Sequence, residues 1–214
     1  MKLDFPNVIA RLDDEALIVQ SDAPLLAISS SVMGGGVLMT RTILNMHVNK
    51  SYNCDNPADD LRALAQKRGI VEPVQGFMTA VYLNKTQSIT LREGALTVAA
   101  LVTAGVSNAT SAGQSLPAAL TPGTINIILL VDANLTPAAL VNAVILATEA
   151  KTASLYQHNI RTSDGLPATG TSTDALCIAC TGRGEATDYA GPATVIGWLM
   201  ARAVRQCIAA ALTV

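Results

Sequence analysis

The chain has 214 residues, of which 50% are hydrophobic, 14% are charged and only 3% are aromatic. This length fits one domain spanning residues 1–214, with a core of Ala, Val, Ile and Leu. The formal net charge is −2, and the longest basic cluster is the pair Lys67-Arg68. These features exclude nucleic acid and an acidic membrane surface as main partners, because both require a basic face.

Two further patterns bear on where the protein works. Residues 1–14 carry three aspartates, whereas a signal peptide has a basic stretch followed by an apolar run. The most apolar helix, expected over residues 193–214, contains Arg202 and Arg205, which favour burial in protein over a membrane span. We therefore expect a cytoplasmic protein. A homo-oligomer is compatible with the many small side chains, although the composition does not require one.

The cysteines predict buried thiols. Cys177 and Cys180 lie in an alternating apolar run, and residues three apart on a strand face opposite sides. No second CxxC and no paired histidines complete a zinc site. Thiols of this kind are consistent with a reducing compartment.

The predicted elements run in chain order as follows. A turn signal at Asp22-Ala-Pro24 separates the first two expected strands, and residues 77–83 and 88–92 could form a hairpin. Strands are expected at residues 16–20, 25–31, 37–52, 77–83, 88–92, 96–106, 124–131 and 174–180, and helices at residues 57–68, 137–157 and 193–214. The helix at residues 137–157 is apolar nearly all round, so we expect it to be largely buried. The fold class is α+β (mixed α/β), with largely antiparallel or mixed β-sheets and helices packed on their outer faces.

Several familiar sites are absent from the sequence. It has no GxxxxGK[ST], no GxGxxG after a strand, no HExxH and no complete GxSxG. With His47 and His158 as the only histidines, a histidine-rich metal centre cannot be built, so no metal ligands are predicted. Neither histidine lies in a D-x-H-x-x-G context, the pattern of proteins that ligate the cobalt of vitamin B12.

Three small-residue segments carry the positive signals. Residues 105–113 (GVSNATSAG) follow a buried strand, where they form either a nest of outward N–H groups or an ordinary turn. Residues 123–126 (GTIN) place Asn126 inside an apolar run, where its amide needs a partner in a neighbouring loop or a ligand. The third segment, residues 168–174 (ATGTSTD), supplies hydroxyls and amides that could cradle a carbonyl oxygen or a phosphate, with Asp174 as an anchor.

Glu149 is the most conspicuous carboxylate. It lies on the expected buried helix and shares a stripe with Asn142 and Tyr156, while Lys151 lies nearly opposite. A buried carboxylate needs an ion-pair partner or takes a raised pKa, and a raised pKa suits a general acid or base. Whether Glu149 is catalytic or structural stays open on these grounds.

Read together, four stretches resemble the adenosylcobinamide amidohydrolase family. They are GTINIILLVDANLTPAALVNAVILATEAKTASL, ATGTSTDALCIACTG, YAGPATVIGWLMARAVRQCIAAAL and, upstream, TAGVSNATSAG; ISSSVMGGG and RTILNMHV match more loosely. The ordered pair EAKT and ATGT-x-TD is the most specific part of the resemblance. Where members of the family commonly have ATGTGTD, this chain has Ser172, which bears on the conformation of that loop.

The resemblance implies hydrolysis of the amide that joins aminopropanol to a corrin side chain, giving adenosylcobyric acid for cobalamin salvage. The cobalt corrinoid is then the substrate, so no protein-bound cofactor or metal is expected. Direct attack by water is favoured over a covalent route, with Thr171 or Thr169 as an alternative nucleophile. The candidate catalytic residues are Glu149, Asp174, His47 and Thr171, and the candidate substrate-binding residues are Asn45, Ser107, Asn108, Asn126, Thr169, Gly170 and Thr173.

Two other functions remain open at this stage. One is a non-catalytic corrinoid or small-molecule binding protein of the same fold. The other is a hydrolase of the same architecture that acts on a different amide.

Overall fold

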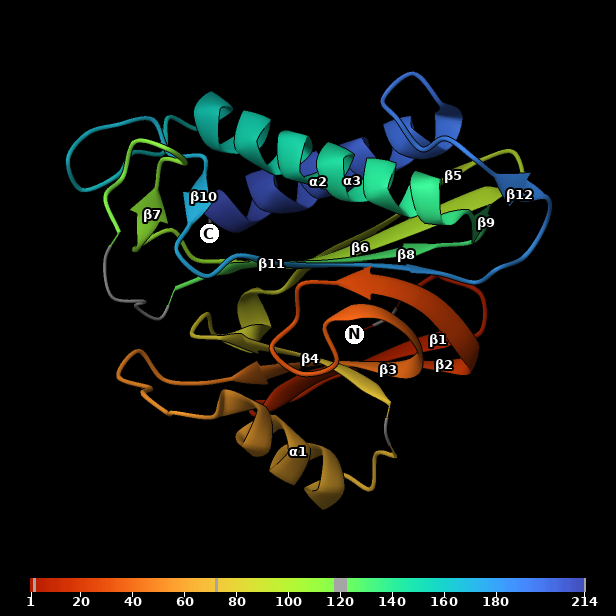
Figure 1. The fold of residues 1–214 in the computed structure, drawn as a ribbon, viewed down its shortest axis with the longest axis horizontal. Coiled ribbons are helices and arrows are strands. Elements are labelled where there is room, and N and C mark those ends of the chain that lie inside the picture. The colour runs from red at the N-terminus through yellow and green to blue at the C-terminus, as the bar shows by residue number, and fades with distance from the viewer. Residues whose placement is uncertain (2, 72, 118–122, 214) are drawn as a thin grey trace.

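The computed structural model describes residues 1, 3–71, 73–117 and 123–213. Its elements form one bent mixed sheet with three α-helices and two small two-stranded sheets (Figure 1). In chain order they are β1 (Val8–Leu12), β2 (Ala16–Ser29), β3 (Gly36–His47), α1 (Pro57–Lys67), β4 (Val74–Thr79), the 3₁₀ turn η1 (Leu83–Lys85), β5 (Gln87–Glu93), β6 (Leu96–Ala104), β7 (Ala109–Thr110), β8 (Ile125–Val131), β9 (Asn134–Leu135), α2 (Pro137–Gln157), β10 (Gly170–Thr171), β11 (Ala175–Cys180), β12 (Ala186–Thr187) and α3 (Val195–Leu212).

The molecule has four layers. Helices α2 and α3 cover one face of β5, β6, β8 and β11, while β1 to β4 form a second layer beneath these strands and α1 covers the outer side (Figure 1). The order in the sheet is β4-β3-β2-β11-β8-β6-β5, with β1 paired to β2. Neighbours are antiparallel except for β8 with β11 and β3 with β4. The α+β class with a mixed, largely antiparallel sheet and outer helices is therefore confirmed.

The strand pattern explains the layers. Along β6, Val98 and Ala100 pack under α2 and α3, whereas Ala99 and Leu101 face the core between the two sheet layers. This period of two is what a strand covered on both faces requires, and it accounts for the continuous apolar run. Asn126 occupies an inward position of β8 and therefore points at the second sheet layer.

Strand β2 joins the two layers. Its residues 16–20 pair with β3 beside β1, and its residues 26–29 pair with β11. The register shifts between Gln20 and Leu25, so the turn signal at Asp22-Ala-Pro24 is an irregularity within one strand. The prediction of two separate strands there is wrong, because the turn residues bend the strand between layers without reversing the chain.

The predicted hairpin of residues 77–83 with 88–92 is also wrong. Residues 77–79 belong to β4, which pairs in parallel with β3, and β5 pairs with β6 around Gly94. The two runs are close in sequence, yet each finds its partner elsewhere.

The helices begin and end as their sequences indicate. Pro57 opens α1, and the side chains of Thr136 and Thr194 cap α2 and α3 by accepting from the N–H groups of Ala139 and Gly197. The expectation that α2 is largely buried is wrong, because one side of it faces outward and Val141 and Ile145 are about half exposed. Helices α2 and α3 are long and apolar enough to span a membrane by length and composition, but each packs on the sheet along one side.

Candidate active site

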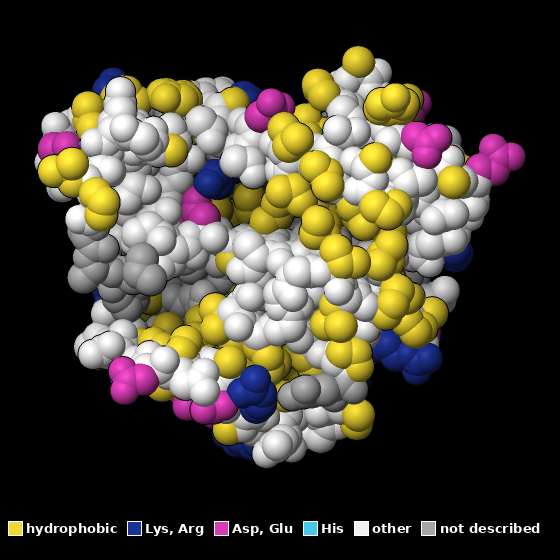
Figure 2. Space-filling view, viewed as in Figure 1, with side chains coloured by type: hydrophobic (Ala, Val, Ile, Leu, Met, Phe, Trp, Pro, Cys, Tyr) yellow, Lys and Arg dark blue, Asp and Glu magenta, His cyan; other side chains and the backbone are white. Residues whose placement is uncertain are grey.

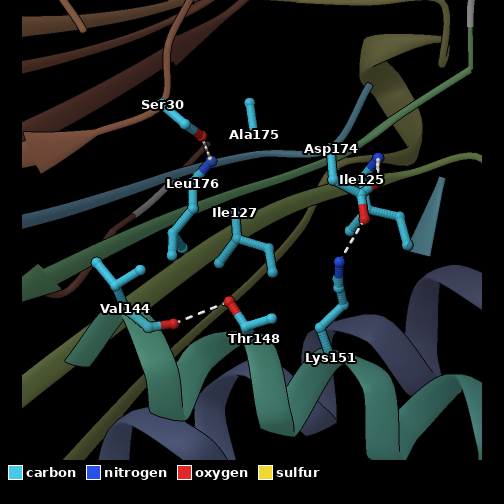
Figure 3. A pocket seen from close by; sticks show the side chains of 9 residues that line it. All are labelled: Ser30, Ile125, Ile127, Val144, Thr148, Lys151, Asp174, Ala175 and Leu176. Atoms are coloured by element: carbon cyan, nitrogen blue, oxygen red, sulfur yellow. Dashed lines mark hydrogen bonds and ion pairs between the residues drawn. The ribbon is translucent and has the colours of Figure 1, made fainter. Parts of the chain in front are cut away.

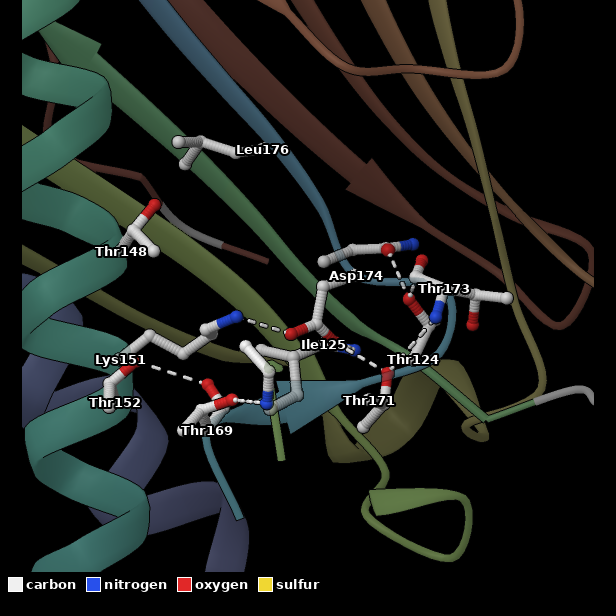
Figure 4. Close-up of polar contacts among 12 residues, drawn as sticks. Thr124, Ile125, Thr148, Lys151, Thr152, Thr169, Thr171, Thr173, Asp174 and Leu176 are labelled. Atoms are coloured by element: carbon white, nitrogen blue, oxygen red, sulfur yellow. Dashed lines mark hydrogen bonds and ion pairs between the residues drawn. The ribbon is translucent and has the colours of Figure 1, made fainter. Parts of the chain in front are cut away.

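Asp174 is the centre of a secluded polar cluster between α2 and the beginning of β11. Its Oδ2 lies 2.5 Å from Lys151 Nζ, its Oδ1 accepts from Thr171 Oγ1 at 2.5 Å, and the N–H of Ile125 donates to Oδ1 at 3.1 Å (Figure 4). The side chains of Lys151 and Asp174 are only 12% and 17% exposed. We call Lys151, Thr171 and Asp174 the Asp174 cluster. An ion pair this secluded is held by hydrogen bonds as well as by charge.

A glycine lets the cluster close. A Cβ on Gly170 would lie 2.4 Å from Asp174 Oδ2 and 2.7 Å from Lys151 Nζ, so a side chain there would displace the ion pair. The segment is held in place because β10 pairs with β7 and because Thr152 Oγ1 donates to the carbonyl of Thr169. Gly170 was predicted to bind substrate, and the structure shows a packing reason for a glycine at this position.

A second polar network lies beneath the cluster, between the two sheet layers. Asn126 Nδ2 donates to Asn45 Oδ1 at 3.0 Å and to the carbonyl of Met78 at 2.8 Å, and Asn45 Nδ2 donates to Thr103 Oγ1. Thr124 Oγ1 lies 2.8 Å from Asn126 Oδ1 and 2.7 Å from the carbonyl of Thr173. Asn45 and Asn126 are each 1% exposed. Of the two alternatives for Asn126, the structure shows the protein partner.

The carbonyl of Gly123 ties the small-residue loops together. It accepts from Thr173 Oγ1 and from Asn108 Nδ2, both at 2.6 Å. Asn108 Nδ2 also donates to Ser172 Oγ, so the serine that departs from the family pattern takes part in the loop contacts. Three loops distant in sequence thus meet at one end of β8 and β11.

Cavities border the cluster. One of about 200 Å³ is lined by Lys151 and Asp174 together with apolar side chains such as Ile125 and Leu176 (Figure 3). Another of about 320 Å³ is lined by Lys151, Asp174 and Thr171. Figure 2 shows a hollow on this face, with a Lys or Arg side chain beside an Asp or Glu side chain on its wall.

A third cavity lies on the other side of the residue 171–174 segment, between the end of β4 and the beginnings of β8 and β11. It measures about 280 Å³, and we call it the inter-sheet cavity. Thr124, Asn126 and Thr173 form its polar end. The residue 171–174 segment therefore lies between the inter-sheet cavity on one side and the two cavities beside the Asp174 cluster on the other.

The structure brings several predicted residues together. Asp174 and Thr171 are hydrogen bonded to each other, and Gly170 and Thr173 flank them. Thr169 Oγ1 accepts from the N–H of Ala112, so this side chain holds the loop. The candidate residues of the 168–174 segment thus lie together, and their catalytic and binding roles stay predictions.

Other predicted residues lie apart. Glu149 is exposed, and no hydrogen bond or ion pair joins it to any residue that the structure describes, so the expectation of a buried carboxylate is wrong. His47 is half-buried, its Nδ1 lies 3.1 Å from the carbonyl of Val81, and its ring lies beside Tyr82. Within the described ranges, no hydrogen bond joins His47 to the Asp174 cluster.

The predicted nest at residues 105–113 is largely used by the protein itself. The N–H groups of Ala109, Ser111 and Ala112 donate to Val106 O, Ser115 Oγ and Thr169 Oγ1. Ser107 is exposed and lines a different cavity beside Tyr82. The segment therefore braces the 168–174 loop, and these three N–H groups are not free for a ligand.

Sequence reasoning missed Lys151 and Thr124. Lys151 stands in the EAKT motif two residues after Glu149, and the near-uniform apolarity of α2 concealed which of the two faces the sheet. Thr124 follows Gly123 directly and could have been chosen by its place beside Asn126.

The cluster has the groups that carbonyl chemistry needs. An ammonium has three N–H donors and Asp174 takes one, so the others can serve an oxygen atom in the adjoining cavities that Lys151 lines. In the part of the chain that the structure describes, no three His, Cys, Asp or Glu side chains are grouped so as to hold a metal ion.

Comparison with known proteins defines the chain as an amidohydrolase, an enzyme that hydrolyses C–N amide bonds. A family model described as adenosylcobinamide amidohydrolase matches residues 6–214, and the chain belongs to this family. It is 33% identical over 210 residues to the adenosylcobinamide amidohydrolase of Methanosarcina mazei, covering 94% of this chain and 96% of the relative.

Two other comparisons are more limited. The adenosylcobinamide amidohydrolase of Halobacterium salinarum is 38% identical over 122 residues, which is 54% of this chain and 50% of that protein. Among solved structures, a Burkholderia sp. beta-aminopeptidase aligns with a TM-score of 0.46 and 16% identity over 96% of this chain and 81% of its own.

Proposed function

We propose that this enzyme hydrolyses the amide that links aminopropanol to a corrin side chain of adenosylcobinamide, releasing adenosylcobyric acid and the free amine. The family supports a hydrolase that acts on adenosylcobinamide. The observation that carries the site assignment is the secluded Lys151–Asp174 pair on the wall of two cavities. The product would serve corrinoid salvage in the cytoplasm.

In the proposed reaction, Lys151 is the residue that stabilises the oxyanion. Water attacks the amide carbonyl carbon, and the negative charge that develops on the carbonyl oxygen is stabilised by an N–H of the Lys151 ammonium. Such preorganised donors contribute most where water is excluded, and both partners of this pair are largely buried. The C–N bond then breaks, both protons of the water pass to the departing amine, which leaves as an ammonium, and the corrin side chain becomes a carboxylate.

Asp174 is the positioning residue of the cluster. Three donors, from Lys151, Thr171 and the N–H of Ile125, converge on its carboxylate and compensate its charge. It therefore fixes the direction of the Lys151 ammonium and the orientation of the Thr171 hydroxyl. The cobalt arrives with the substrate, so this reaction calls on no protein-bound metal or cofactor.

The direct test is incubation of the purified protein with adenosylcobinamide, followed by chromatography for adenosylcobyric acid and aminopropanol. Equimolar formation of both products supports the proposal. Tight binding without product would favour a corrinoid-binding protein, and neither binding nor product would favour a different amide substrate.

A variant of Thr171 separates the two hydrolytic routes. If water attacks directly, Thr171→Val loses only a positioning contact, and kcat should fall by about tenfold. If Thr171 were the nucleophile, the same change would remove nearly all activity and Thr171→Ser would retain it, with an acyl-enzyme detectable by mass spectrometry.

A further inference from the structure

We infer that the inter-sheet cavity binds the adenosyl group of the corrinoid, while the amide is presented to the Asp174 cluster. This inference rests on the proposed function, since it divides one substrate between two sides of the residue 171–174 segment. An adenosyl group combines a flat, weakly polar ring with a polar edge and a ribose. The cavity has walls of the same mixed character.

The lining of the cavity combines apolar and polar side chains. Its apolar wall is formed by Val32, Val48, Pro57 and Met78, and its polar end by Thr124 and Thr173. A wall of aliphatic side chains with a few convergent polar groups is the usual make-up of a small-molecule site.

Its size selects one part of the substrate. Pockets for drug-sized ligands measure about 300–1,000 Å³. At about 280 Å³ the inter-sheet cavity lies at the lower bound, which suits one nucleoside-sized group rather than a whole corrin macrocycle. The macrocycle would then rest outside the inter-sheet cavity, on the surface of the protein.

Tyr52 supplies an aromatic wall for a flat ring. Its hydroxyl donates to Asp60 Oδ2 at 2.7 Å, which anchors the side chain to α1, and burial together with this carboxylate raises its pKa. Asn53, next in sequence, adds an amide to the lining. An aromatic face combined with an Asn amide is a frequent way to bind adenine, since the amide matches N6 and N7.

The inter-sheet cavity lies next to the catalytic region, across a stretch of backbone that lines both. Ala175 lines both the inter-sheet cavity and the cavity that holds Lys151 and Asp174. Thr173, directly before Asp174, lines the inter-sheet cavity. A ligand bound there lies beside the chain segment that carries the Asp174 cluster.

Cys54 provides a direct probe of occupancy. It is the exposed cysteine that lines the cavity, whereas Cys177, Cys180 and Cys207 are buried. Burial raises the pKa of both Cys177 and Cys207 to about 12, so their thiols resist alkylation. N-ethylmaleimide should therefore modify Cys54 selectively in the wild-type protein, and Cys54→Ser should abolish the labelling.

The first experiment measures this alkylation rate by mass spectrometry with 5′-deoxyadenosine as the probe ligand. At ten times its dissociation constant, the nucleoside should slow modification of Cys54 by about tenfold through mass action. An unchanged rate up to the highest soluble concentration of nucleoside, with binding absent by calorimetry, would overturn the inference. Protection by dicyanocobinamide but not by 5′-deoxyadenosine would assign the cavity to the macrocycle and would also overturn it.

The second experiment compares adenosylcobinamide with dicyanocobinamide, which has the same macrocycle and amide but no adenosyl group. Val32→Glu introduces a charge into the apolar wall and should raise KM for adenosylcobinamide about tenfold with little change in kcat. Its KM for dicyanocobinamide should stay at the wild-type value. Val32 is 46% exposed, so the fold should tolerate the change; Val37→Glu, on an exposed position of β3, is the matched control.

The outcomes separate this inference from the proposed function. Cleavage of both corrinoids with equal kcat/KM by the wild-type enzyme would overturn the adenosyl assignment and leave the amidohydrolase intact. Failure to cleave either corrinoid would overturn the proposed function, and the alkylation experiment would still decide whether the cavity takes a nucleoside.

Discussion

The two ends of β8 and β11 carry the same kinds of side chain in different surroundings. At the beginning of these strands, Asp174 pairs with Lys151 and accepts from Thr171. At their other end, Asp132 pairs with Arg183 at 2.6 Å and accepts from Thr181 Oγ1 at 2.8 Å. Each end thus has an aspartate, a cation and a threonine hydroxyl.

The difference lies in the cation and in the space beside it. Lys151 is 12% exposed and lines two cavities, whereas Arg183 is 50% exposed and lines neither of them. Asp132 is itself only 13% exposed, so the half-exposed cation is what lets water screen that pair, whereas both partners of the Lys151–Asp174 pair are secluded and their charges act more strongly on a ligand. Both ends have an aspartate, a cation and a threonine, but only the end where the cation is buried beside a cavity is a candidate site.

The largest effect should come from the secluded cation. Lys151→Met removes the proposed oxyanion donor, and kcat should fall by about 10²- to 10³-fold, as for loss of a donor in other oxyanion holes. Turnover of adenosylcobinamide under saturating conditions is the measurement. Asp174→Asn, which weakens the hold on Lys151, should also lower kcat.

The matched control is Asp132→Asn at the opposite end, which should leave kcat within about twofold because the site is not disturbed. Equal losses from Asp132→Asn and Asp174→Asn would show that both pairs act only on the fold. The comparison between the two ends would then fail.

The next effect concerns stability at the site end. Asn126→Ala leaves Asn45 Oδ1 and the carbonyl of Met78 without their donor in a buried place. The free energy of unfolding should fall by about 2–3 kcal/mol, measured by urea denaturation with an unchanged m-value. Asn142→Ala, on the half-buried side of α2, should change it by less than about 0.5 kcal/mol. Equal changes in the free energy of unfolding for the two variants would show that the hydrogen bonds between Asn45 and Asn126 do not stabilise the fold.

Gly170→Ala should show whether the position of the Lys151–Asp174 pair affects activity independently of the stability of the fold. The new Cβ would overlap Asp174 Oδ2 and Lys151 Nζ, which are the ends of movable side chains. We expect kcat to fall on the order of tenfold because the pair is displaced, with little change in melting temperature. Gly191→Ala, where a Cβ meets nothing within 4 Å, is the control. Full activity of Gly170→Ala would show that the close approach is not needed.

The smallest effect should come from the exposed ion network between α1 and the β1–β2 turn. Asp13 is partly desolvated, which raises its pKa, but hydrogen bonds from Arg68 and from the N–H groups of Ala16 and Glu15 outweigh this and hold the pKa below its ordinary 3.8. Because the folded state has the lower pKa, this contribution is present above pH 3.8 and is lost as the pH falls through the lowered value.

Asp13→Asn should therefore reduce stability at pH 7 by less than about 1 kcal/mol, since both side chains of the Asp13–Arg68 pair are partly exposed to water. The difference from wild type should vanish in strong acid. A difference that grew as the pH fell would contradict the assigned direction of the pKa shift.

Local signals predicted local structure. The boundaries of α1 and α2 follow from Pro57 and from the Thr136-Pro137 cap, and β6 and β8 follow from continuous apolar runs. The 168–174 segment was predicted as a site because small polar residues cluster there. These features depend on residues that are close along the chain.

Features that depend on distant partners could not be predicted in the same way. Asn45 and Asn126 are 81 positions apart, and nothing local indicates that their amides meet. The expectation that Glu149 is buried was wrong for a related reason, since the apolar residues around α2 do not show which side faces the sheet. Tertiary packing decides that orientation.

The bent strand β2 also constrains how the protein is made. Ile28 pairs with Ile178, so the edge of β2 that will meet β11 stays open while most of the chain leaves the ribosome. An apolar strand edge of this kind can pair with other chains, and contacts between such distant residues form slowly. The β2–β11 junction thus joins the two layers, and it can form only after the residues of β11 have been synthesised.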